Sequence, residues 1–518
     1  MPLSTGYTSS PDKPSLFSRP LSDTETPFVY AITAPRPFIR EPVRIHIFAD
    51  VAIPESPTSA TSALRMAWKA LRLLHEPDIA TTFDPATMEK VYEVEDEAGV
   101  ECWLKRTFMV AAQGESVEEV VRREKSRTEH MPVCHVIPKP SYAPAAAEPP
   151  TLNATILLLF SHWRTEASGV YMLLNRLLLL AGDILSSSHS KTTLALQSHT
   201  PGDEISLLTP PPEDMACPVP DKSVSDNEAI RRTVHTRFES HRLKLPSIEV
   251  PSTNPATHPT GSVQVHRVVF SQADTSKVIA ACKAASPNVS VTATCLAAYL
   301  LSIWPLLPKN RDSWFASMMP AQMRTRLSAE GTEMYKAMGC WNAAQMLLLS
   351  SPPPTAATSS GSKQLTFLER TRELHAQAAI ANRPQWLLEM RELSKQSAAF
   401  WASIPAGSGA APWFTSLGDL ERGGLLQQTY DIRSCEAHEA TQIKLEQIYG
   451  WADPVGMGIV LTVWTFRGKM NWQIQWNDAY HERAIVAGIL NAMTDEIAKG
   501  LPNLQEALVP IEVVENLY

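Results

Sequence analysis

The stretch that decides the fold runs from Thr155 to Leu185 and reads TILLLFSHWRTEASGVYMLLNRLLLLAGDIL. Its first six residues are a continuous apolar run of strand length, which predicts a buried strand ending at Phe160. The Leu-rich run after Gly169 predicts a buried helix. Between the two lie His162, directly after the strand, and Glu166, four residues later. Ligands of α/β proteins bind beyond the carboxyl ends of strands, so His162 is the first candidate site residue.

A histidine in this position can act as a general base. Its ordinary pKa is close to neutral, and a ring nitrogen just outside a core strand can be open to substrate. The competing interpretation is a packing or surface histidine, since the chain contains 14 histidines. Position alone leaves both interpretations open.

Further helices and strands are expected on both sides of this stretch. Apolar residues at helical spacing, with capping residues at several starts, predict helices over 62–75, 116–130, 226–240, 272–285, 290–304 and 482–500. Alternation predicts a strand over 262–270. Residues 458–478 have the pattern of a hairpin that turns at the sequence RGK.

These patterns predict two α/β halves of about equal size. A Pro-, Ser- and Thr-rich crossover over about 195–260 joins them, and a second breaker-rich loop covers 350–363, before a long helical region to about 400. We expect a flexible lead-in over 1–27, an N-terminal lobe over 28–225 and a C-terminal lobe over 226–518. A chain of 518 residues is long enough for two or more domains.

Composition excludes several classes of protein. Apolar residues make up 44% and charged residues 19%, which is typical of a folded globular chain and not of a disordered one or a coiled coil. The net charge of −8 and the lack of a basic face argue against nucleic-acid binding. The seven scattered cysteines are typical of a reducing compartment. Without an apolar N-terminal segment or a run of about 20 apolar residues, we expect a cytoplasmic protein with no membrane span.

Familiar catalytic and metal-binding signatures are missing from the sequence. It contains no G-x-x-x-x-G-K-[ST], no H-E-x-x-H, no G-x-S-x-G and no G-x-G-x-x-G. The segment HMPVCH holds His130, Cys134 and His135 but no fourth ligand nearby, so we expect no metal site. Trp464, Trp472 and Trp476 are expected to pack in a core or a pocket wall.

The segment HWRTEASG resembles the H-x-x-x-D-G motif of the chloramphenicol acetyltransferase-like superfamily, which includes the plant BAHD acyltransferases and peptide-synthetase condensation domains. Within it, the Leu-rich helix that follows is similar to that of fungal enzymes resembling trichothecene 15-O-acetyltransferase. Other segments resemble that subfamily in the same order along about 60–500, namely AWKALRLLHEPDIATTF, ECWLKRTF, SVTATCLAAYLLSI, MPAQMRTRL followed by MGCWNA, PWFTSLGDLE and TVWTFRGKMNWQIQWNDAYHE.

The resemblance implies two sandwich lobes with an active-site tunnel between them. An acyl-CoA co-substrate, with acetyl-CoA the commonest in the family, would meet a hydroxylated secondary metabolite at His162. The imidazole would take a proton from the acceptor hydroxyl, and the acyl group would pass directly from sulfur to oxygen without a metal or a bound cofactor. The resemblance further implies a cytoplasmic monomer.

Other residues receive roles from the same resemblance. Glu166 would form an ion pair with Arg324 or Arg326, and Arg324 is also a candidate to bind substrate. Asn342 would lie near the tunnel. On one hairpin strand, Thr465 or Thr462 would donate a hydrogen bond to the oxyanion. The competing interpretations are a solvated charge for either arginine, a turn residue for Asn342 and sheet packing for the two threonines.

The chain departs from the family motif at two positions. Glu166 stands where the family has Asp, and Ala167 stands where it has Gly, a residue that permits backbone torsions Ala tolerates poorly. Two alternatives therefore stay open beside the CoA-dependent transferase. One is a condensation-type enzyme that takes its acyl group from a carrier protein. The other is a degenerate member that binds or cyclises a small molecule without acyl transfer.

Overall fold

The computed structural model describes most of the chain. The described residues are 6–33, 44–54, 59–125, 131–139, 150–215, 224–242, 250, 252, 261–306, 315–324, 337–349, 366–382, 386, 389, 392, 412–432, 441–453, 458–502, 504 and 508–515. The loop expected over 350–363 and most of the helical region expected to 400 lie outside them.

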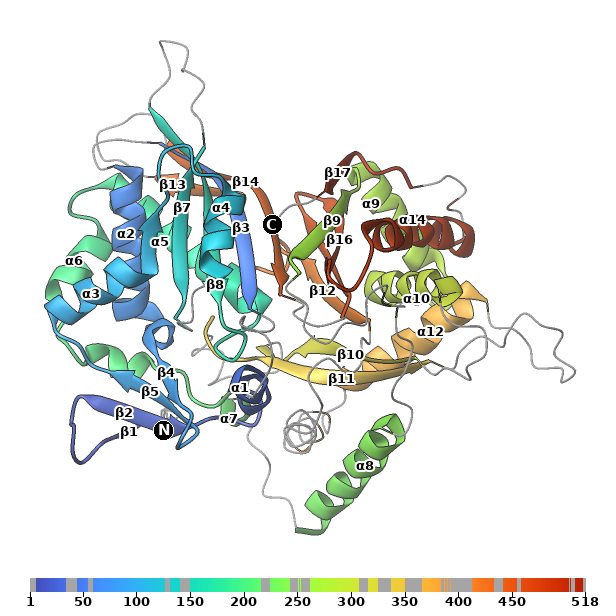
Figure 1. Ribbon diagram of the computed structural model, residues 1–518, viewed down its shortest axis with the longest axis horizontal. Coiled ribbons are helices and arrows are strands. Elements are labelled where there is room, and N and C mark those ends of the chain that lie inside the picture. The colour runs from blue at the N-terminus through green and yellow to red at the C-terminus, as the bar shows by residue number, and fades with distance from the viewer. Residues whose placement is uncertain are drawn as a thin grey trace, which may run out of the picture.

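A six-stranded sheet forms the N-terminal lobe (Figure 1). Its strand order is β13-β14-β3-β8-β7-β6, and only the pair β6–β7 is parallel. The strands are β3 (Ile45–Pro54), β6 (Phe108–Val110), β7 (Val133–Pro138), β8 (Thr151–Phe160), β13 (Thr429–Ile432) and β14 (Thr441–Ala452).

Strand β8 is buried on both faces, which explains its unbroken apolar run. Ile156 and Leu158 point into the large core that helices cover, whereas Leu157 and Leu159 point into a smaller core on the opposite face. The sequence prediction of a buried strand ending at Phe160 is confirmed.

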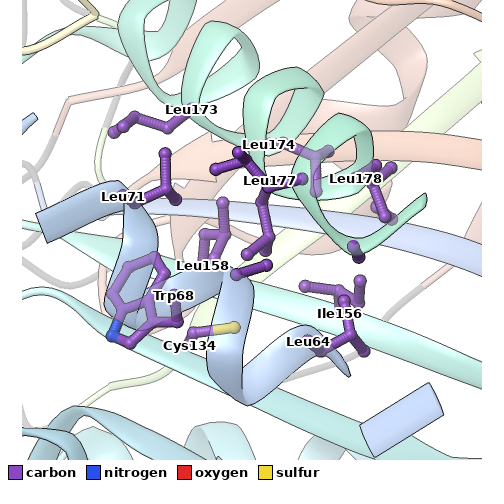
Figure 2. Packing of buried hydrophobic residues seen from close by; sticks show 14 of the residues in the cluster. Leu64, Trp68, Leu71, Cys134, Ile156, Leu158, Leu173, Leu174, Leu177 and Leu178 are labelled. Atoms are coloured by element: carbon purple, nitrogen blue, oxygen red, sulfur yellow. The ribbon is translucent and has the colours of Figure 1, made fainter. Parts of the chain in front are cut away.

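Helices cover the face of this sheet to which Ile156 and Leu158 point. They include α2 (Ala60–Ala70), α3 (Glu97–Thr107), α5 (Ala167–Ser186) and α6 (Lys191–Ser198). Figure 2 shows leucines of α5 packed against Trp68 of α2 and Leu71, which directly follows α2. The same leucines lie near Ile156 and Leu158 of β8. Of the described helices, α5 is long and apolar enough to cross a membrane by length and composition, but 72% of its apolar window is buried inside the protein. It is the central core helix of this lobe.

The C-terminal lobe is built on a five-stranded sheet of order β12-β15-β16-β9-β17, in which only β12–β15 is parallel. Its strands are β9 (Val263–Val269), β12 (Trp413–Asp419), β15 (Val460–Phe466), β16 (Lys469–Asn477) and β17 (Glu512–Glu515). Its helices include α9 (Gln272–Ala284), α10 (Val291–Ile303), α12 (Phe367–Ala378) and α14 (Arg483–Gly500). These helices enclose a second core that contains Trp472 and Trp476.

Most expected elements of this half are confirmed. The hairpin β15–β16 turns at Arg467 and Gly468, which both have positive φ, as a tight two-residue hairpin requires. Helix α10 starts at the expected cap, since the Ser290 side chain accepts a hydrogen bond from Ala293 N. Helix α14 ends at Gly500.

The two lobes interlock. Strands β13 and β14 come from the C-terminal half of the chain, yet they complete the N-terminal sheet, with β14 paired antiparallel to β3. The amide of Gln473 on β16 donates to the Gly450 carbonyl of β14 at 2.6 Å. The chain therefore enters the first lobe twice, and the boundary expected at 225/226 does not separate the strands of the two sheets.

The flexible lead-in expected over 1–27 is replaced by ordered structure over the described residues 6–27. Strands β1 (Thr8–Ser9) and β2 (Leu16–Pro20) form a four-stranded sheet with β4 (Thr82–Asp84) and β5 (Glu89–Glu93), in the order β1-β2-β5-β4. Helix α1 (Thr26–Thr33) follows. The expectation was wrong because Arg19 and Glu25 are buried as an ion pair, so the polarity of this segment does not indicate exposure.

The remaining elements link these parts. They are a π-turn (Leu71–His75), 3₁₀ turns (Pro77–Ala80, Asp203–Leu207, Trp304–Leu306 and Ala379–Asn382), α4 (Val117–Lys125), α7 (Pro212–Met215), α8 (Val224–Arg242) and the two-stranded sheet of β10 (Phe315–Gln322) and β11 (Asn342–Leu349). Helix α8 lies within the expected crossover, where a helix over 226–240 was expected.

Candidate active site

His162 lies in a tight turn directly after β8, as the sequence predicted. The turn is closed by a hydrogen bond from Arg164 N to the Ser161 carbonyl at 3.1 Å. The His162 side chain is partly exposed, whereas its neighbours in this turn are buried. Its Nδ1 atom is buried. On one face the ring stacks on Phe28 of α1, with centroids 4.1 Å apart and an interplanar angle of 8°.

Glu166 fixes the end of this turn. It is the N-cap of α5, and its Oε1 accepts a hydrogen bond from Gly169 N at 3.1 Å. Its Oε2 accepts from Trp341 N at 2.9 Å. The same carboxylate forms a buried ion pair with Arg324, so the expected glutamate–arginine pair is present. Glu166 therefore joins the start of a core helix to two segments of the other chain half.

The Arg324 side chain is engaged with protein groups around the start of α5. Its side chain is almost fully buried, and besides Glu166 it donates to the Ala337 carbonyl at 2.7 Å. Its guanidinium also lies 5.6 Å from the centroid of the Trp341 ring. The alternative partner, Arg326, lies outside the described residues.

The segment 337–341, AMGCW, clamps the histidine turn from the side of the C-terminal half. Gly339 N donates to the Arg164 carbonyl at 2.7 Å, and Thr165 Oγ1 donates to the Ala337 carbonyl at 2.8 Å. Gly339 has φ +103, a left-handed conformation that favours glycine. The turn that carries His162 is thus held between the two chain halves.

A second buried carboxylate supports the same clamp. Glu76 accepts hydrogen bonds from Ala337 N at 3.0 Å and from Met338 N at 3.2 Å, and it forms an ion pair with Arg176 of α5 at 2.6 Å. Nothing in the sequence singled out Glu76. In the sequence, Glu76 is a charged residue directly after an apolar helix. Such a residue is common at protein surfaces, so it does not indicate a buried role.

The two departures from the family motif do not break this geometry. Ala167 is the first residue of α5 and does not have positive φ, so the glycine-like torsion is not needed there. Gly169 is the residue that requires the absence of a side chain. A Cβ at Gly169 would lie closer than van der Waals contact to Thr165 Oγ1 and the Ala337 carbonyl.

A network of buried charges lies beneath the turn. Lys90 forms ion pairs with Asp78 at 2.8 Å and with Glu25 at 3.3 Å, and its ammonium group lies 5.8 Å from the Trp163 ring centroid. Arg164 donates to Thr81 Oγ1 at 3.0 Å. Burial alone would raise the pKa of the Glu25 carboxyl, but the charges of Arg19 and Lys90 outweigh it and hold that pKa well below its usual range.

Two predicted site residues are not brought to His162 by what the structure describes. Asn342 opens β11 with its backbone opposite Gln322, and its side chain is outside the described part. Thr465 pairs with Met470, a member of the C-terminal core, and therefore faces the helices of that lobe. Three positions along β15 separate Thr465 from Thr462, so the two side chains lie on opposite faces of the sheet, and the oxyanion role of either residue stays a prediction. Thr462 pairs with Gln473 on the face toward β14.

Two residues of the segment HMPVCH, Cys134 and His135, lie on opposite faces of the N-terminal sheet. Cys134 and His135 are consecutive on β7, so their side chains point to opposite faces of the sheet. Cys134 packs in the large core, and His135 Nε2 lies 3.2 Å from Glu124 Oε1. His130 lies outside the described residues, and within the described ones there is no group of three or more His, Cys, Asp or Glu that could hold a metal ion.

Known proteins resemble this chain in sequence and in fold, although no protein-family model matches it. The O-acetyltransferase pigM of Monascus ruber is 26% identical over 484 residues, covering 92% of this chain and 84% of that protein. The TRI3 trichothecene 15-O-acetyltransferase of Fusarium sporotrichioides has a TM-score of 0.77 at 16% identity, covering 97% of this chain and 99% of that one. The EpoB NRPS cyclization-docking bidomain of Sorangium cellulosum has a TM-score of 0.56 at 12% identity, covering 94% and 86%.

These matches confirm the predicted fold and the predicted resemblance. The chain has the two-lobed α/β fold of the chloramphenicol acetyltransferase-like superfamily, and it is similar to the fungal acetyltransferases within it. The expected enzyme class, an acyltransferase, is confirmed as well.

Proposed function

We propose that this acyltransferase moves an acyl group, acetyl first among them, from a CoA thioester to a hydroxyl group of a small secondary metabolite, with His162 as the general base. One observation carries the proposal. His162 is a partly exposed imidazole at the carboxyl end of a core strand, and the segment 337–341 that holds its turn is itself bound by two buried carboxylates, Glu166 and Glu76. The acetyl group and the metabolite acceptor are proposed from the similarity to pigM and TRI3.

The reaction needs one proton to move twice. Since Nδ1 is buried, we assign the base to Nε2, which takes the proton of the acceptor hydroxyl while the oxygen attacks the thioester carbonyl. When the carbon–sulfur bond breaks, the histidinium returns that proton to the CoA thiolate. General-base catalysis of this kind contributes about 10²–10⁴-fold, and holding both reactants together contributes further.

Glu166 and Arg324 act on this chemistry indirectly. Both side chains are buried and engaged with the backbone of 337–341, so neither reaches the reacting atoms. Their role is to keep the histidine turn in one conformation, and a longer carboxylate with its arginine in place does this without the family's Asp. The motif departure therefore gives no support to a degenerate member without acyl transfer.

The test is an acyl-transfer assay of the purified protein with acetyl-CoA and an extract of small hydroxylated metabolites. Wild type should release free CoA thiol and add the mass of an acetyl group to one metabolite, while His162→Ala should lose at least 10²-fold of the rate. His189→Ala removes an exposed histidine and should leave the rate unchanged. A near wild-type rate for His162→Ala at an unchanged thermal midpoint contradicts the assignment.

A carrier-protein thioester is the second candidate donor. The observation that favours it is the fold shared with the EpoB cyclization-docking bidomain. An acyl group loaded on a phosphopantetheinylated carrier protein separates the two donors. Transfer from the carrier but from no acyl-CoA would replace the CoA proposal, and transfer from neither donor would leave a binding or cyclising role.

A further inference from the structure

We propose that Phe28 is a positioning residue for the His162 base, and that the N-terminal segment 6–33 is part of the active site. The proposal rests on the proposed function, because it assigns His162 the role of base. It deepens that function by naming the group that sets the orientation of the imidazole ring.

The contact itself is a parallel ring stack. The centroids of Phe28 and His162 are 4.1 Å apart and the planes differ by 8°, so Phe28 covers one face of the imidazole. Figure 1 shows α1, which carries Phe28, in the middle of the molecule rather than at its edge. Both residues are only partly buried.

The turn directly before α1, residues 22–25, is fixed to the N-terminal lobe. Glu25 Oε2 accepts a hydrogen bond from Ser22 N at 2.9 Å, and Ser22 Oγ accepts one from Glu25 N at 3.1 Å, which together form a reciprocal cap. The same carboxylate receives two hydrogen bonds of 2.8 Å from the Arg19 guanidinium and lies 3.3 Å from Lys90 Nζ. Phe28 follows this anchor by less than one helical turn.

The geometry suits a base. The lone pair that accepts a proton lies in the plane of the imidazole, so an aromatic ring on the face restricts rotation of the side chain without covering the nitrogen. A flat ring is needed for this effect, since a branched aliphatic side chain of similar volume lacks the parallel face. Buried Lys90 also places α1 and the His162 turn on one rigid support, because it contacts both Glu25 and the Trp163 ring.

The stack has a spectroscopic signature that does not depend on activity. With histidine labelled at Cε1 in a deuterated protein, the His162 resonance is assigned by its loss in His162→Gln. The ring current of Phe28 should hold the Hε1 signal at high field. Phe28→Leu should move it to lower field, Phe28→Tyr should keep it in place, and the exposed His189 should not respond in either variant.

The kinetic arm tests the role in the reaction. Phe28→Leu should lower kcat about tenfold and leave KM for both substrates within twofold, since it loosens the base and not the binding of the reactants. Phe28→Tyr should restore kcat. Equal kcat for wild type and Phe28→Leu, or a Phe28→Tyr as slow as Phe28→Leu, overturns the proposal.

The two arms separate this proposal from the proposed function. If wild type transfers no acyl group from any donor, the proposed function fails, and the position of the Hε1 signal still decides whether the stack orders His162. If wild type is active but the Hε1 signal does not move in Phe28→Leu, the stack is absent in solution and only the present proposal is overturned. Should Phe28→Leu not fold, Phe28→Met is used in its place, with the thermal midpoint as the check.

Discussion

At the scale of single residues, the His162 turn depends on two buried carboxylates that bind backbone and arginine groups. Glu166 receives two backbone N–H groups and an arginine, and Glu76 receives two backbone N–H groups and another arginine. Such charge-assisted hydrogen bonds are strong in a buried setting. Neutralising either carboxylate is therefore costly, because its arginine partner loses the opposite charge beside it.

Glu166→Gln should therefore lower the free energy of unfolding by about 3–5 kcal/mol, because it leaves the Arg324 charge buried without its partner. Urea unfolding followed by tryptophan fluorescence measures the change. The control Glu446→Gln removes an exposed carboxylate of β14 and should stay within about 0.5 kcal/mol of wild type. A loss below 1 kcal/mol for Glu166→Gln would show that the pair does not hold the turn.

Glu25 makes the stability sensitive to acid. Its pKa in the folded protein is lowered relative to about 4.3 in the unfolded chain, so its stabilising contribution is complete above that value and is lost as the pH falls toward the folded pKa. As the pH is lowered below about 4.3, the unfolding free energy of wild type should decrease more steeply than that of Glu25→Gln. Urea titrations across the acid range check this, and two parallel curves would contradict it.

At the scale of elements, the start of α5 is the tightest junction of the site. Helix propensity alone would make Gly169→Ala stabilising by about 0.5–1 kcal/mol. The added methyl group would collide with the Thr165 side chain and the Ala337 carbonyl, and overpacking of this kind costs about 1–3 kcal/mol. The collision is the larger effect, because one of the two groups is backbone of the clamp.

Gly169→Ala should thus destabilise the protein by about 1–2 kcal/mol and slow acyl transfer, since the His162 turn must move. The matched control is Gly488→Ala in α14, where a methyl group would have nothing within 4 Å and should stabilise by about 0.5–1 kcal/mol. Thermal unfolding of both variants gives the comparison. A stabilised Gly169→Ala would mean that the clamp is looser than described.

Elements with strong local signals were predictable from the sequence, and long-range contacts were not. The β8–α5 unit, the β15–β16 hairpin and α10 follow from periodicity, turn residues and caps, and His162 followed from its place after β8. The clamp by 337–341 joins residues more than 150 positions apart, so no local pattern reports it. The sequence also could not distinguish Thr462 from Thr465, because the alternation of a strand does not say which of its faces meets the other lobe.

At the scale of the whole molecule, the N-terminal sheet contains two strands, β13 and β14, from the C-terminal half of the chain. The two lobes are therefore expected to fold as one unit. A fragment ending at Arg242 contains β3 and β8 but lacks β13, β14 and the clamp. Expressed alone, it should give no cooperative urea transition, and co-expression with the remaining chain should restore a folded complex. In the full chain, the urea transitions measured by fluorescence and by far-UV circular dichroism should have the same midpoint. A fragment with a sharp transition of its own would show that the first lobe is independent.

The late return of β14 also has a consequence for synthesis in the cell. Strand β3 lies between β14 and β8 in the sheet, and it is synthesised long before β14, residues 441–452. Until β14 is made, the β14-facing edge of β3 is unpaired, and an open strand edge is a template for pairing with other chains. A holdase bound to the nascent chain should therefore raise the soluble yield, because it covers this edge until β14 pairs with it.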